Sequence, residues 1–185
     1  MTKFYFEVKL SQKLKFVLKK ISITQIHSIQ SQLILEPSSQ QHIENRELIF
    51  AQTISASIDK VWQAWANANQ IAQWWGPNGF TNTIYLMDFK EEGEWKFTMH
   101  SPDGTNFPNR SIFKEIVPHH KIVYEHFNPH FIATVLFEAR GEETWMEWKM
   151  LFDSAEMYEI IVKAHKADEG LKQNFEKLEK FLTQA

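Results

Sequence analysis

Two adjacent tryptophans, Trp74 and Trp75, run directly into Gly76-Pro77, and Gly79 and Phe80 follow closely. A pair of tryptophan side chains carries a large apolar area that favours burial. The Gly-Pro step ends whatever helix precedes it. The stretch therefore predicts a helix that ends on the tryptophans, a rigid turn, and a strand that starts at about Phe80.

The composition favours one folded domain with an appendage. The chain has 185 residues, 43% of them hydrophobic and 14% aromatic, which is enough for a substantial core. It has no cysteine, which excludes disulfides, thiolate metal sites and a cysteine nucleophile and suits a reducing compartment. The net charge of −3 argues against nucleic acid or an anionic membrane as a partner. No apolar run approaches the roughly 20 residues of a membrane span, so we expect a cytoplasmic protein.

The charge is distributed unevenly along the chain. Residues 1–20 are strongly basic, with Glu7 as their one acidic residue, and residues 37–41 read as a Pro-Ser-Ser-Gln-Gln linker. We place a domain boundary near residue 43. The prediction is a basic N-terminal extension, 1–43, followed by a single domain, 44–185.

Hydrophobic periodicity within 44–185 predicts a strand, two short helices, a series of strands, a helix that begins at Ser154 and a longer last helix. The short helices are indicated by the spacing of Ile58, Val61, Trp62 and Trp65 and by residues 69–75. The expected strands are residues 47–55, 94–100, 111–117, 121–127, 132–140 and 144–152, besides the one that starts near Phe80.

The last helix, from about Asp168, places Leu171, Phe175, Leu178 and Leu182 on one stripe. Consecutive strands after the helices imply an antiparallel sheet, and a single apolar stripe implies a helix that covers it. The fold class is therefore α+β, with a curved antiparallel sheet of six to seven strands wrapped on a long C-terminal helix. We expect a cavity between the sheet and that helix.

Four stretches carry a resemblance to a known family. They are Val61-Trp62-Gln63-Ala64-Trp65, the stretch from Trp74 to Thr81, the segment from Asp103 to Arg110, and the segment from Trp148 to Glu156 with the later Glu169-Gly170-Leu171-Lys172-Gln173. Over residues 46–183 the chain resembles the activator of heat-shock-protein-90 ATPase homologue family, within the START-like or SRPBCC helix-grip superfamily.

The resemblance implies a helix-grip fold and a pocket between sheet and helix that suits a small apolar ligand. Eukaryotic namesakes of the family stimulate a chaperone ATPase, which implies a chaperone partner and a role in the stress response. Other branches of the superfamily include cyclases, dehydratases and lipid carriers, so the resemblance alone does not select one function.

Strand alternation and the helix stripe indicate which side chains face the pocket. The expected ligand-binding residues are Trp95, Phe97, Met99, Phe113, Tyr124, Phe137, Trp148, Met150, Leu171 and Phe175. Ordinary core packing is the alternative role for each of them. Trp148, Met150 and Phe175 are the preferred subset, because the last strand and the last helix should face each other.

Proton-transfer groups are few. Tyr124 and His126 share one strand face while Glu125 lies on the other, so Tyr124 and His126 are the weak catalytic candidates if their face points inward. Arg110 either anchors an acidic ligand group or pairs with a carboxylate such as Glu115 or Glu138.

We expect neither a metal nor a cofactor. His126 and His130 are four residues apart, but Pro129 lies between them, and no His-Glu-x-x-His spacing occurs. There is also no glycine-rich phosphate loop and no Gly-x-Ser-x-Gly elbow.

The sequence therefore favours a domain that binds a small hydrophobic molecule without transforming it. The first alternative is a chaperone-interaction module, and the second is a cyclase- or hydrolase-like enzyme that uses the same pocket. An enzyme is the less favoured reading, and the sequence leaves monomer and homodimer open.

Overall fold

The computed structural model describes residues 46–164 and 166–184. The predicted N-terminal extension and the boundary at residue 43 lie outside this range. The strands are β1 (Glu47–Ile54), β2 (Thr81–Met87), β3 (Glu94–His100), β4 (Asn106–Val117), β5 (Lys121–Phe127), β6 (His130–Arg140) and β7 (Glu143–Phe152). The helices are α4 (Ile58–Ala66), α5 (Ala68–Trp74), α6 (Ala155–Tyr158), the π-helix η1 (Glu159–Ala164) and α7 (Ala167–Gln184).

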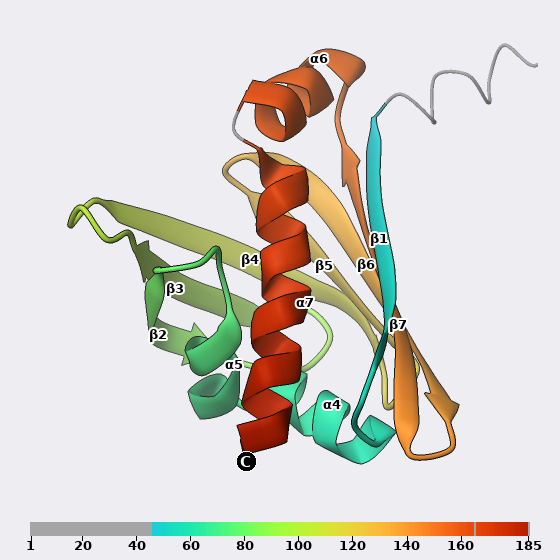
Figure 1. Cartoon of the computed structure of the whole chain (residues 1–185). Coiled ribbons are helices and arrows are strands. Elements are labelled where there is room, and N and C mark those ends of the chain that lie inside the picture. The colour runs from blue at the N-terminus through green and yellow to red at the C-terminus, as the bar shows by residue number, and fades with distance from the viewer. Residues whose placement is uncertain (1–45, 165, 185) are drawn as a thin grey trace, which may run out of the picture. The chain divides into compact units, whose positions relative to one another are not determined.

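The seven strands form one antiparallel sheet in the order β1-β7-β6-β5-β4-β3-β2. Strands β2 to β7 follow one another as a meander, and β1 pairs with the last of them. Helix α7 crosses one face of the curved sheet (Figure 1). The predicted α+β helix-grip fold is confirmed.

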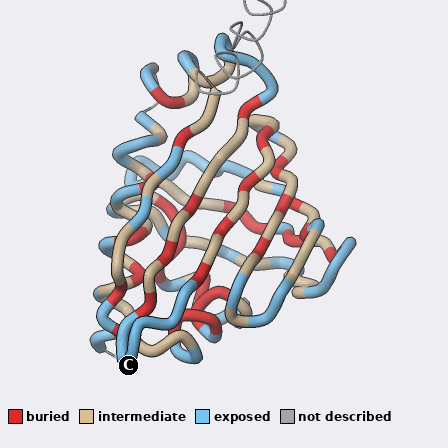
Figure 2. Tube along the Cα trace, turned by 90° about the vertical axis from the view of Figure 1, so that its right-hand side faces the viewer, coloured by how far each residue is buried: buried red, intermediate tan, exposed pale blue. Residues whose placement is uncertain are grey.

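Alternation along the strands explains why one face of the sheet needs a cover. In β5 every second residue is buried, among them Tyr124 and His126, and β6 repeats the pattern until its last three residues (Figure 2). The predicted stripe on α7, with Leu171, Phe175 and Leu178, is buried. Burial of each such side chain stabilises the folded state by roughly 1.5–3 kcal/mol relative to leaving it exposed to water. This shared burial holds the helix on the sheet.

Two elements differ from the sequence prediction. β4 begins at Asn106 instead of Ser111, because its first residues pair with β3, for example Phe107 with Met99. Pro108 lies within this pairing. Proline lacks the N–H that a central strand uses, so its presence argued against a strand in the sequence prediction. The helix predicted after Ser154 is a single α-turn that continues as the π-helix η1.

The turn after α5 is tied to α7 by three side chains of that helix. Lys177 Nζ donates to the carbonyl oxygens of Trp75 and Gly76 at 3.1 and 3.0 Å, and to two further carbonyls of the turn at 3.4 and 3.5 Å. Asn174 Oδ1 accepts from the Gly76 N–H at 2.6 Å, and Gln173 Oε1 accepts from the Asn78 N–H at 2.8 Å. Burial lowers the pKa of Lys177 below its ordinary value.

Glycine is required in this turn for conformational reasons. Gly76 has φ +87° and Gly79 has φ +81°, which L side chains rarely adopt. A Cβ on Gly79 would also lie 2.8 Å from Pro102 Cγ. The sequence prediction of a rigid turn after the tryptophans is confirmed.

We predict that Lys177→Met destabilises the domain by about 1–2 kcal/mol, since hydrogen bonds to a charged donor are lost and turn carbonyls are left with fewer partners. Chemical denaturation measures the change. Lys172→Met is the matched control on the same helix, because Lys172 forms an exposed pair with Glu176 at 3.9 Å; it should change stability by less than about 0.5 kcal/mol. Equal effects of the two substitutions would contradict a structural role for Lys177.

Candidate functional site

A cavity of about 180 Å³ lies between the sheet and the first half of α7. Strands β3 to β7 form its floor, and the turn that follows Trp75 forms one side. Helix α7 supplies the other side through Ala167, Gly170, Leu171 and Asn174. The remaining lining residues are Trp75, Gly76, Pro77, Phe97, Met99, Asn109, Tyr124, His126, Phe131, Trp148 and Met150.

The structure brings six of the expected ligand-binding residues together on this cavity. They are Phe97, Met99, Tyr124, Trp148, Met150 and Leu171. They come from three strands, β3, β5 and β7, and from helix α7, so no single stretch of sequence contains the cavity wall. Both weak catalytic candidates, Tyr124 and His126, lie on the wall as well.

The other four expected residues lie in the core around the cavity. Trp95 and Phe113 stack on each other with ring centroids 6.0 Å apart. Phe137 packs against Trp62 of α4 at 5.6 Å, and Phe175 packs against Phe50 of β1 at 4.8 Å. They support the wall instead of forming it. Phe175, a member of the preferred subset, is among them.

Sequence reasoning missed several lining residues although signals for them existed. Ala167, Gly170 and Asn174 fall at i, i+3 and i+7, with the predicted Leu171 at i+4, so extending the predicted stripe by one turn would have included them. Phe131 shares the buried face of β6 with Phe137. What the periodicity does not give is the position along α7 at which space remains between the helix and the sheet.

The polar groups of the wall are held in their neutral forms. Burial raises the pKa of the Tyr124 hydroxyl far above its ordinary value, although the neighbouring Trp148 indole lowers it in part. Burial lowers the pKa of His126 to about 4, while a backbone contact at Asn128 opposes that change. The His126 ring lies with Nδ1 3.0 Å from Ser111 Oγ.

These pKa values limit the chemistry of the site. At neutral pH Tyr124 is too weak an acid to be ionised, and His126 is a weak base. No Asp, Glu, Lys or Arg is among the described lining residues. The wall therefore offers hydrogen bonds and apolar contact, and it offers little acid–base power.

A larger groove of about 530 Å³ lies where α5 and the turn meet the C-terminal half of α7. Its lining includes Gln73, Glu176, Lys177 and Lys180. Lys177 is already engaged by the turn. We therefore take the smaller, aromatic cavity as the candidate site.

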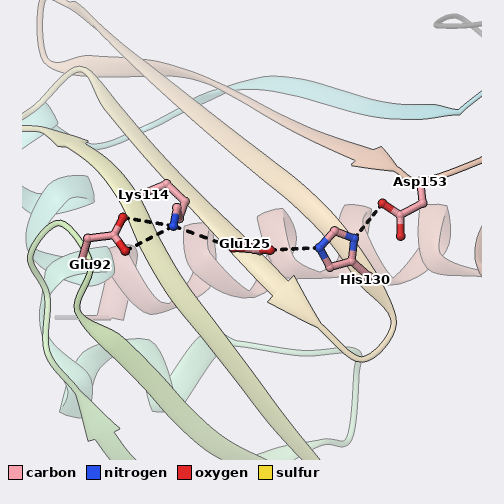
Figure 3. Close-up of polar contacts among 5 residues, drawn as sticks. All are labelled: Glu92, Lys114, Glu125, His130 and Asp153. Carbon is pink, nitrogen blue, oxygen red and sulfur yellow. Dashed lines mark hydrogen bonds and ion pairs between the residues drawn. The ribbon is translucent and has the colours of Figure 1, made fainter.

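A connected set of charged side chains lies on the outer face of the sheet (Figure 3). His130 lies with Nε2 3.1 Å from Glu125 Oε1 and Nδ1 2.7 Å from Asp153 Oδ1. Lys114 Nζ lies 3.0 Å from Glu92 Oε1 and 3.9 Å from Glu125 Oε2. Because both ring nitrogens face carboxylates, His130 satisfies both only as an imidazolium. Glu125 and Asp153 accordingly raise its pKa.

Arg110 belongs to this outer face. Its Nε lies 2.6 Å from Glu94 Oε1, and its guanidinium lies 4.6 Å from the centre of the Phe127 ring. The suggested partners Glu115 and Glu138 were wrong, because they pair with Lys121 and Arg140. Strand register places Lys96 of β3 opposite Arg110, which puts Glu94 within reach.

The described part of the chain lacks two further features. No group of three or more His, Cys, Asp or Glu side chains there is arranged to hold a metal ion. No helix of that part of the chain is long and apolar enough to cross a membrane.

Comparison with known proteins supports the fold. The family model described as activator of Hsp90 ATPase homolog 1-like protein matches residues 55–183. No curated protein matches the chain.

Solved structures similar to this one come from several bacteria. A crystal structure of a protein from Nitrosomonas europaea has a TM-score of 0.70 and 17% identity, and the match covers 76% of this chain and 96% of that one. A solution structure from Arthrobacter aurescens has a TM-score of 0.73 and 21% identity, with 77% and 89% covered. The AHSA1-like protein from Aeromonas hydrophila has a TM-score of 0.58 and 17% identity, with 72% and 93% covered. At these identities the likeness shows the fold.

We predict that His126 makes the domain less stable in acid. The pKa of His126 is about 4 in the folded protein and near 6.5 when unfolded, so the unfolded chain binds more protons between these values. The contribution of neutral His126 to the free energy of unfolding is complete above about pH 6.5 and is lost as the pH falls toward 4. A His126→Gln variant should show a shallower fall of melting temperature over that range. An unchanged slope would contradict burial of a neutral histidine.

His130 should act in the opposite direction. Its raised pKa means that its stabilisation is complete below about pH 6.5 and is lost as the pH rises through the folded-state value. His130→Gln should therefore lower the melting temperature at about pH 6 more than at about pH 9. A loss that is larger at the higher pH would show that the imidazolium is not the stabilising form.

Proposed function

We propose that this chain, which belongs to the activator of Hsp90 ATPase homolog 1-like family, binds a small apolar molecule in the cavity between its sheet and α7. The observation that carries the proposal is the wall itself. Five strands, a turn and a helix each contribute side chains to one space lined mainly by aromatic and aliphatic groups. Ligand sites commonly combine such walls with a few polar groups.

The size of the cavity limits the ligand. An apolar cavity of roughly 150 Å³ takes up benzene, and the cavity here is about 180 Å³. A molecule of one ring with a short substituent therefore suits it better than a long lipid. Met99 and Met150 are flexible walls that adjust to different shapes.

Binding without chemistry is the form of the proposal that the site supports best. Tyr124 and His126 both face the cavity, so they are the groups that a cyclase- or hydrolase-like reaction would use. Their pKa values are displaced away from neutrality, which weakens them as acid and base. We further propose that residues 44–185 form the binding domain and that it works in the cytoplasm.

We predict that Met150→Trp abolishes binding while the fold survives, because the larger side chain fills the cavity. Toluene is the probe, and its affinity for the full chain is measured by calorimetry. We expect a loss of at least about tenfold, equivalent to about 1.4 kcal/mol. Native mass spectrometry of the gently purified wild type should also reveal a small molecule, and this molecule should be absent from the variant.

Ile49→Trp is the matched control, since Ile49 of β1 is 50% exposed and does not line the cavity. It should leave toluene binding unchanged. Unfolding curves of both variants separate lost binding from lost structure. If folded Met150→Trp binds toluene as the wild type does, the cavity is not the binding site.

The family description suggests an alternative function, which is interaction with a chaperone. That alternative rests on the description alone and is tested apart from the cavity, by measuring the ATPase of the cognate chaperone with saturating amounts of the full chain. Stimulation that persists in Met150→Trp would favour an interaction module over a ligand-binding domain.

A further inference from the structure

The cavity wall contains a hydrogen-bond donor that the protein does not satisfy. Trp148 is 2% exposed, and its indole Nε1 has no hydrogen-bond partner among the described residues. Leaving a buried donor unpaired costs about 1–3 kcal/mol. Trp148 lines the cavity, so a molecule there is close enough to supply the missing acceptor.

Tyr124 adds a second donor beside the first. The Trp148 indole lies near enough to the Tyr124 hydroxyl to lower its pKa in part. Tyr124 is 1% exposed, so its hydroxyl is withdrawn from bulk water. The two side chains come from β5 and β7, which are separated in the sheet by β6. They form a paired set of donors on the cavity floor.

The other polar side chains of the wall have partners of their own. His126 is engaged with Ser111 at 3.0 Å. Asn174 is held between Gly76 N and Gly170 O. Asn109 donates to the carbonyl of Phe107 at 2.7 Å. The buried group of the wall that lacks a partner is thus a donor, the Trp148 indole N–H, so the cavity favours a ligand with a hydrogen-bond acceptor.

We infer that the ligand is an uncharged single-ring compound with a hydrogen-bond acceptor, such as an aryl ketone or aldehyde, whose oxygen accepts from the Tyr124 hydroxyl and the Trp148 indole N–H. This inference rests on the proposed function and specifies its ligand class. The ring lies among Phe97, Phe131 and Trp75, where aromatic edges and faces are available to it.

The charge of the ligand follows from the wall. A carboxylate in this cavity would be stripped of water with no Lys or Arg among the described lining residues to compensate. An ammonium would find no carboxylate there either. A neutral carbonyl accepts both hydrogen bonds and leaves no net charge buried.

The test compares three probes of similar size on the full chain. Acetophenone has the acceptor, α-methylstyrene has the same shape with a methylene in place of the oxygen, and benzoate carries a charge. Calorimetry should show acetophenone binding about tenfold more tightly than α-methylstyrene, the effect of about one net hydrogen bond. Benzoate should bind at least tenfold more weakly than acetophenone.

Tyr124→Phe should remove most of the preference for acetophenone and leave the affinity for α-methylstyrene unchanged. Tyr85→Phe is the matched control, because Tyr85 is 65% exposed on β2 and outside the cavity. It should preserve the preference.

The indole N–H of Trp148 supplies a readout that does not depend on a Tyr124 variant folding. Its ¹⁵N-correlated NMR signal, assigned by its loss in Trp148→Phe, should move downfield with acetophenone and not with α-methylstyrene. If the signal does not move and the two probes bind equally, the acceptor inference is wrong while the proposed function stands. If neither probe binds, the proposed function and this inference are both overturned.

Discussion

The attachment of the turn after Trp75 to helix α7 is the constraint on which the rest of the domain depends. Lys177 donates to carbonyls of the turn, and Asn174 accepts from the Gly76 N–H. These bonds connect the end of the short helices to the middle of α7. Trp75 lines the cavity and packs on Trp95 and Trp148 of the sheet with ring centroids 4.7 and 5.0 Å away, so the same bonds hold the cavity wall formed by the turn against α7.

Side-chain size along α7 explains why the space lies at one end. Near the short helices, Trp62, Trp65 and Phe137 fill the gap between layers, and the ring centroid of Phe137 lies 5.6 Å from that of Trp62 and 6.0 Å from that of Trp65. Toward the start of α7, Ala167 and Gly170 present little volume, and a Cβ on Gly170 would meet Pro77 Cγ at 3.7 Å. The cavity therefore occupies the end where small helix residues leave space beside the aromatic residues of the strands.

The candidate site was predictable from sequence only in part. Alternation placed Tyr124, Trp148 and Met150 on the inner face correctly, since side-chain direction in a strand has a period of two. Alternation could not distinguish the residues that line the cavity from those that pack in the core around it. Phe175 has the same periodicity as Leu171, yet it packs on Phe50 while Leu171 lines the cavity. That difference depends on the distance between helix and sheet, which periodicity does not encode.

The sequence by itself determined most of the elements, their order and the α+β class, because local patterns such as the stripe of α7 and the Gly-Pro turn depend on neighbours in the chain. The family resemblance added the helix-grip fold. The tertiary structure decided what those patterns could not contain. It placed Arg110 beside Glu94 through the register of β3 and β4. It also brought Tyr124 and Trp148 together on the floor of one cavity. Contacts between residues far apart in the chain follow from strand register and layer spacing, and these are settled only when the whole domain packs.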